Sequence, residues 1–268
     1  MYTYTIESLY DLPKADKAVF IFANTTDLHK LSTNPNITMQ LCTFDEDLPV
    51  IVVVPSEEFI PLYDRACAPN TYILCLKGSR PSSWQRLWTY LLRTKVYSTA
   101  LFVEWNILLS NTKTGRLFNM TKNPNYPWEG SPTEPLDFVD WYDNMTQTLH
   151  SNSLASVGVD RRHASDVLSW MSVDEEYQYP IQLVMYDFDK LRELKVSTQP
   201  ALNATNSVIR DTLIDLAIRD AGGLSNTVPQ FSINTPSVVY TEEDLHALLQ
   251  LPKKYPRLFR RMSNERLR

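Results

Sequence analysis

The sequence predicts an α/β (or α+β) protein with a mixed sheet and flanking helices in its N-terminal half. Short apolar runs have the length and composition of largely buried strands, and they lie at residues 18–23, 39–44, 49–54, 72–76 and 100–109. Segments with helical periodicity alternate with these runs, which favours a partly parallel sheet. The 268 residues are 43% hydrophobic, which is enough to fill a sizeable core. We expect the C-terminal half to be mainly helical with a few strands.

The clearest helix of the N-terminal half is predicted at Ser83–Lys95. Trp84 and Trp88 belong to an apolar stripe with the spacing i, i+3, i+4, i+7. We therefore expect both indoles in the core. A turn over 111–115 should then return the chain into an antiparallel strand at 116–120.

A proline-rich segment and a basic C-terminal segment divide the chain into four parts. Residues 121–135 contain four prolines and one glycine, so we expect a Pro-rich connection there. It follows an α/β subdomain at 1–120 and precedes a mainly helical subdomain at 136–251. A basic C-terminal tail occupies 252–268.

Periodicity in the C-terminal half predicts several helices and one strand. The helices are expected at 136–150, 162–171, 189–196, 207–221 and 241–251, and the strand at 180–186. Gly222 and Gly223 follow the fourth of these helices and should end it. Thr241 and Asp244 resemble a capping box at the start of the last helix.

The sparse glycines exclude several common site motifs. Six glycines cannot form G-x-G-x-x-G, G-x-x-x-x-G-K-[ST] or G-x-S-x-G at any position. The four histidines are scattered, so no zinc-ligand spacing is present and no cofactor is expected. The longest apolar run is far short of the roughly 20 residues that a membrane-spanning helix needs. No signal-peptide pattern follows Met1, and the three cysteines include no C-x-x-C, so we expect a cytoplasmic protein with reduced thiols.

The net charge of −5 hides a strong partition along the chain. Residues 65–128 contain nine basic residues and one acid, and the tail 252–268 contains seven basic residues and one acid. These two segments carry formal charges of +8 and +6, which leaves −19 for the other 187 residues. Such asymmetry indicates anionic partners or self-association.

Two basic clusters are candidates for binding a partner or a nucleic acid. Their members are Arg80, Arg86, Arg93 and Lys95 in the first segment, and Arg257, Phe259, Arg260 and Arg261 in the tail. In one interpretation the arginines bind phosphates while neighbouring aromatic side chains stack on bases. In the other, the first cluster is a solvated helix face, and the tail docks on the acidic surface of a second copy.

Acidic residues provide two candidate chemistries. Asp187 and Asp189 follow the apolar strand at 180–186 and could share a divalent cation, or one of them could cap the helix that follows. Glu104 lies within an apolar run, so its carboxylate must be ion-paired or have a raised pKa. We expect an ion pair.

No catalytic pattern is stronger than its plain structural explanation. The sequence therefore favours a non-enzymatic interaction or assembly protein that associates with itself or with a larger protein complex. Abundant Asn, Thr, Ser and Tyr with few glycines resemble the composition of virus-encoded structural or accessory proteins, and in that case the chain would lie within a virus particle. Two alternatives stay open: an RNA-binding protein that uses 65–128, and a metal-dependent enzyme that acts on a phosphorylated substrate through Asp187 and Asp189.

Overall fold

The structure is a computed structural model, and it describes residues 4–23, 48–66, 71–76, 80–105, 107–119, 133–161, 182–198, 201, 204, 206–234 and 240–257. Its strands are β1 (Tyr4–Ile6), β2 (Lys17–Phe22), β3 (Val50–Val54), β4 (Tyr72–Cys75), β5 (Thr99–Glu104), β6 (Leu108–Asn111), β7 (Leu117–Asn119), β8 (Thr133–Pro135), β9 (Ser156–Arg161), β10 (Leu183–Asp187) and β11 (Ser225–Asn234). Its α-helices are α3 (Ile60–Ala66), α4 (Arg80–Arg93), α5 (Phe138–Ser151), α6 (Phe188–Glu193), α8 (Ser207–Asp220), α9 (Glu242–Leu249) and α10 (Leu251–Lys254). Two 3₁₀ turns, η1 (Leu9–Asp11) and η2 (Glu57–Phe59), complete the elements.

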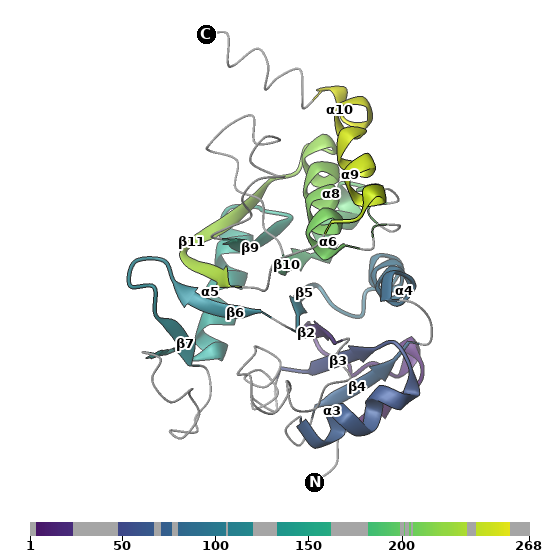
Figure 1. Cartoon of the computed structure of the whole chain (residues 1–268), viewed down its shortest axis with the longest axis vertical. Coiled ribbons are helices and arrows are strands. Elements are labelled where there is room, and N and C mark those ends of the chain that lie inside the picture. The colour runs from purple at the N-terminus through teal and green to yellow at the C-terminus, as the bar shows by residue number, and fades with distance from the viewer. Residues whose placement is uncertain are drawn as a thin grey trace.

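All of these strands belong to one mixed sheet, with the order β1-β4-β3-β2-β5-β10-β9-β11-β6-β7-β8 (Figure 1). The strands β1 to β5 pair in parallel, whereas β10 is antiparallel to both of its neighbours, β5 and β9. The α/β class predicted from the sequence is thus confirmed. The sheet continues across the Pro-rich connection, because β10 from the C-terminal half pairs directly with β5 from the N-terminal half.

Helices cover both faces of the sheet and form a three-layer arrangement. Side chains alternate along β2: Phe20 and Phe22 pack on the face covered by α4, α6 and α8, while Val19 and Ile21 pack on the face covered by α3 and α5. Burial on both faces explains why the parallel strands are continuous apolar runs. Trp84 and Trp88 of α4 are buried and stacked at 4.9 Å, which confirms their prediction as core residues.

Several elements differ from their predicted bounds. The run at 100–109 was expected to be one strand, but the chain turns at Trp105, so that β5 and β6 pair with different parts of the sheet. The strand predicted at 180–186 begins only at Leu183, after Gln182 with a positive φ of 60°. The predicted strand at 39–44 and helix at 162–171 lie outside the described residues. None of the helices in the described ranges is long and apolar enough to cross a membrane.

The helix α8 ends as the sequence predicts. Gly222 has a φ of +85°, a conformation that glycine adopts without steric cost, and its N–H donates to the carbonyl of Arg219. Gly223 lies so close to the helix that an added Cβ would be 2.7 Å from Leu194 Cδ1. The capping box of Thr241 and Asp244 is also present at the start of α9.

Candidate functional site

The strand order places a topological switch point between β2 and β5. From β2 the chain moves outward to β3 and then β4, and it returns to the other side of β2 as β5. In open α/β sheets, ligands bind outside the carboxyl ends of the strands at such a reversal. Here those ends are Phe22 and Glu104, which lie opposite each other in the parallel register.

A buried group of charges occupies this switch point. Arg210 of α8 donates from Nη2 to Glu104 Oε1 at 3.0 Å and from Nε to Asp211 Oδ1 at 3.2 Å. All three side chains are buried, with relative exposures of 3–5%. Because each ion would lose its hydration on folding, the group is stable only when its members are paired and hydrogen-bonded to each other. The ion pair predicted for Glu104 is confirmed, although its partner comes from α8.

Backbone contacts tie this charge group to the end of β5. The backbone N–H of Glu104 donates to the carbonyl of Gln182 at 2.9 Å, and the N–H of Gln182 donates to Asp211 Oδ2 at 2.7 Å. The guanidinium of Arg210 also lies 4.6 Å from the ring centre of Trp84. The group of Glu104, Gln182, Arg210 and Asp211, which we call the edge cluster, therefore joins β5, β10 and α8.

Burial shifts the pKa of two side chains near the edge cluster. Burial raises the pKa of Tyr186 well above its usual range, and the negative charge of Asp211 adds to this effect. Burial likewise raises the pKa of Asp215 above its ordinary value, against the opposing effect of Arg219, which donates to it at 2.7 Å. Both groups face a low-dielectric interior, in which the charged form is disfavoured.

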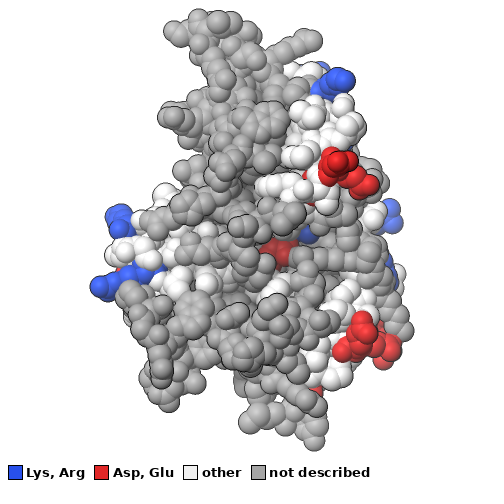
Figure 2. All heavy atoms as spheres, viewed as in Figure 1, with Lys and Arg blue, Asp and Glu red and all other residues white. Residues whose placement is uncertain are grey.

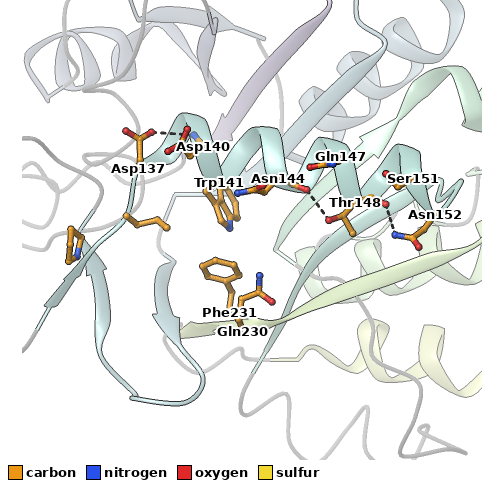
Figure 3. Close-up of a pocket in the computed structure, with 12 residues that line it drawn as sticks. Asp137, Asp140, Trp141, Asn144, Gln147, Thr148, Ser151, Asn152, Gln230 and Phe231 are labelled. Carbon is orange, nitrogen blue, oxygen red and sulfur yellow. Dashed lines mark hydrogen bonds between the residues drawn. The ribbon is translucent and has the colours of Figure 1, made fainter.

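A second feature is an open groove of about 660 Å³ on the other face of the sheet (Figure 3). It lies between the exposed side of α5 and the part of β11 that contains Gln230 and Phe231. Pro229 interrupts β11 there: pairing with β9 shifts register between Thr227 and Ser232, as expected where proline cannot donate to the ladder. The resulting bulge turns Gln230 and Phe231 toward α5.

The predicted metal ligands lie at the opposite edge of the sheet from the edge cluster. Since β10 is antiparallel to β5, Asp187 pairs with Thr99, roughly 17 Å from Glu104 at about 3.3 Å per residue. Asp187 Oδ1 accepts from the N–H of Lys190 as the cap of α6, and Asp189 pairs with Arg192. Within the ranges that the structure describes, no three His, Cys, Asp or Glu residues come together as a metal site. A metal role for Asp187 and Asp189 stays a prediction.

The predicted basic clusters are only partly described. Arg86 and Arg93 are exposed on α4, on the side away from the buried indoles, and Lys95 is exposed just after the helix. Arg80 begins α4, and Arg257 is exposed after α10. Phe259, Arg260 and Arg261 lie outside the described residues. In Figure 2 basic and acidic side chains both appear on the same face, and small groups of the two signs lie near one another at its right-hand side.

Sequence reasoning missed Arg210 and Asp211, which were read as part of an ordinary helix. The sequence does indicate that this helix is buried, because residues 207–221 carry apolar side chains over a broad face of the helix. A helix this apolar is buried on most sides, and its charges must then find partners inside the protein.

Comparison with known proteins finds similar folds among solved structures but no similar sequence. No protein-family model and no curated protein matches the sequence. The structure is similar to glucosyl-3-phosphoglycerate synthase from Mycobacterium tuberculosis in complex with Mg²⁺ and UDP, with a TM-score of 0.52 and 10% identity, over 95% of this chain and 87% of that one. A second structure of that enzyme, with Mn²⁺, UDP-glucose and phosphoglyceric acid, gives 0.50 and 10% over 88% and 79%. The mannosyltransferase PcManGT from Pyrobaculum calidifontis, in complex with GDP-Man and Mn²⁺, gives 0.44 and 10% over 81% and 56%.

These neighbours correct the function expected from the sequence. A non-enzymatic, virus-encoded assembly protein was expected, whereas the two structures above with TM-scores of 0.52 and 0.50 are of an enzyme, solved with UDP or UDP-glucose. The expectation arose because the sequence contains no glycine-rich phosphate motif and no catalytic pattern stronger than its structural explanation. Contact with RNA or with a second copy of the chain stays a prediction.

Proposed function

We propose that this chain is an enzyme that binds a nucleotide-linked sugar outside the carboxyl ends of β2 and β5 and transfers the sugar to an acceptor. The switch point between these strands, with the edge cluster directly beneath it, is the observation that carries the proposal. The fold likeness to an enzyme solved with UDP, over 95% of this chain, supports it.

Sugar transfer requires particular chemical groups near the carboxyl ends of β2 and β5. The bond from the anomeric carbon to the diphosphate oxygen breaks, a bond to an acceptor oxygen forms, and the acceptor loses its proton. Negative charge develops on the departing diphosphate, so fixed positive charge nearby lowers the barrier. The guanidinium of Arg210 does not meet this demand, because it is buried and paired with the carboxylates of Glu104 and Asp211.

We assign Glu104 and Arg210 positioning roles. Their side chains are buried and bound to each other, so neither is offered to a substrate as the structure stands. Their pairing fixes the end of β5 against α8, and a substrate site depends on such fixed geometry to within fractions of an ångström.

Divalent cations accompany the nucleotide in the structures of the neighbour, which raises the question whether one fits here. Glu104 is the described carboxylate at the end of β5, and its Oε1 already accepts from Arg210. The described residues thus do not assemble a divalent-cation site, and the proposal assigns no step to a metal.

Isothermal titration calorimetry with UDP, GDP, CDP and ADP tests the proposal. The titrations are run on the full chain in EDTA and again with Mn²⁺. We expect at least one nucleoside diphosphate to bind. If none binds under either condition, the proposal is wrong.

Matched variants locate the binding edge. Glu104→Gln keeps the shape of the side chain but removes its charge, so it should weaken binding at least tenfold. Asp187→Asn, which keeps a capping side chain at the opposite edge, should change binding less than twofold. Circular dichroism melting verifies that both variants are folded. If Asp187→Asn abolishes binding while Glu104→Gln does not, the nucleotide lies at the other edge.

A further inference from the structure

The groove beside α5 has a lining suited to a neutral ligand with many hydroxyl groups. Figure 3 shows the side chains of Asn144, Gln147 and Ser151 along one side of α5, with Gln230 across the groove. At about 660 Å³ the groove lies within the range of 300–1,000 Å³ that is usual for small-molecule sites, but it is much more polar than most of them.

The polar groups of the groove are largely uncommitted. The side chains of Asn144, Gln147, Ser151 and Gln230 make no hydrogen bond to any other part of the described chain, and all four residues are exposed. Each amide offers an acceptor oxygen and two N–H donors, and each hydroxyl offers both functions. Three amides and a hydroxyl thus present alternating donors and acceptors to a ligand.

An apolar floor lies beneath these polar groups. Trp141 and Phe231 pack edge to face, with ring centres 5.9 Å apart, and both line the groove. Trp141 is 3% exposed, and its indole N–H has no hydrogen-bond acceptor among the described residues. A buried donor without a partner costs about 1–3 kcal/mol, so a ligand oxygen that reached it would recover part of that cost.

The charge of the groove excludes two other ligand classes. None of the described residues that line it is a lysine or an arginine, so these residues offer no counter-charge to a nucleotide or another phosphate. Among the described lining residues the carboxylates are those of Asp137 and Asp140, and Asp137 already accepts from the N–H groups of Val139 and Asp140 as the cap of α5. A single uncommitted carboxylate is a weak basis for a cationic ligand.

From these observations we infer that the groove binds a neutral saccharide, such as a stretch of a linear glycan. Amides and hydroxyls along the helix would bind its hydroxyls, above the buried side chains of Trp141 and Phe231. The inference extends the proposed function by naming a substrate class, a neutral glycan held on the opposite face from α8. It rests on the groove and not on the edge cluster, so it can fail independently of nucleotide binding.

Nuclear magnetic resonance of the indole N–H groups provides a direct test. The chain has six tryptophans, and Trp141→Phe assigns the signal of Trp141 by its loss. The probes are maltohexaose, cellohexaose, laminarihexaose and chitohexaose, each titrated to 10 mM into the full chain. We expect at least one of them to shift the Trp141 signal in a saturable manner.

Variants then separate the groove from non-specific binding. The double variant Asn144→Ala/Gln230→Ala should weaken that oligosaccharide at least tenfold. Asp143→Ala, on the same helix but outside the groove, should leave its affinity within twofold. Because these residues are exposed, the melting temperature should change little, and it is measured for each variant.

Three results would overturn the inference. The first is that no neutral hexasaccharide moves the Trp141 signal. The second is that the double variant binds like the parent. The third is that a synthetic peptide of residues 252–268 shifts the Trp141 signal while the sugars do not, which would identify a basic segment as the occupant. Loss of nucleotide binding with intact saccharide binding would count against the proposed function alone.

Discussion

The helices α5 and α8 have the same length and the same kind of cap, yet they are used in opposite ways. Both have 14 residues, and each begins with a side-chain oxygen, from Asp137 or Asn206, that accepts from two backbone N–H groups. α5 buries one stripe and turns polar side chains to an open groove, whereas α8 is buried from Val208 to Ile218. A polar residue on α5 is thus available to ligands, while a charged residue on α8 must find its partner inside the protein.

This contrast places the two proposed subsites on two faces of one sheet. The edge cluster on the α8 side fixes the carboxyl end of β5, and the groove on the α5 side provides exposed polar side chains. A rigidly held strand end suits the geometry of a group transfer, and exposed amides suit a ligand with many hydroxyls.

The largest effect should follow from breaking the edge cluster. Arg210→Ala leaves Glu104 and Asp211 buried without their guanidinium, which should lower the free energy of unfolding by about 3–5 kcal/mol. Chemical denaturation of the full chain measures it. A loss below about 1 kcal/mol would show that the cluster is solvated and that the contrast between the helices is wrong.

The second effect concerns Asp215 on α8 and its dependence on pH. Burial raises its pKa in the folded state, so the folded protein binds this proton more readily than the unfolded chain. Its contribution to stability is therefore fully present below the unfolded pKa of about 3.9 and is lost as the pH rises through the folded pKa, with a slope of at most about 1.4 kcal/mol per pH unit.

Asp215→Asn removes this titration. The difference in unfolding free energy between the parent and the variant should shift against the parent as the pH rises from about 4, and it should level off above the folded pKa. Denaturation curves at several pH values provide the comparison. A difference that shifts in favour of the parent over this range would mean that Arg219 dominates over burial.

The third effect should be equal on the two helices. Asp137→Ala and Asn206→Ala each remove a cap that accepts from two N–H groups, and each should cost about 1 kcal/mol. Equal losses of unfolding free energy would show that the two helices differ in their surroundings and not in their N-terminal caps. A loss at Asn206 several times larger than at Asp137 would indicate that the start of α8 also supports the edge cluster.

The smallest effect is expected at an ion pair on the surface of α5. Asp143 and Lys17 are 2.7 Å apart, but their side chains are 58% and 34% exposed. Asp143→Ala should therefore cost less than about 1 kcal/mol, and less still in 0.5 M salt. A cost near that of Arg210→Ala would remove the distinction between exposed and buried pairs.

The sequence predicted those helices and strands in which the pattern of apolar residues shows which side is buried. The apolar runs became β2, β3, β4 and β5, and the stripe of Trp84 and Trp88 became the buried side of α4. By contrast, β9 and β11 were not predicted, because Gly158 and Pro229 interrupt their strand patterns. Their pairing is decided by contacts far apart in the chain.

The candidate site was predictable only in part. Glu104 could be recognised as a carboxylate in need of a partner, since it stands in an apolar strand. Its partner Arg210 is 106 residues away, and no local pattern connects the two. Asp187 and Asp189 attracted notice by their spacing, but the spacing does not reveal that β10 runs antiparallel and ends at the other edge of the sheet.

Hydrogen exchange of the full chain tests most directly the central claim, that a nucleotide binds at the switch point. The exchange of backbone amides is compared with and without the best-binding nucleoside diphosphate at saturation. The account predicts slower exchange around Phe22, Glu104 and Gln182, and no change around Asp187 at the far end of β10. Slowing confined to residues 187–193, with none at the ends of β2 and β5, would contradict it.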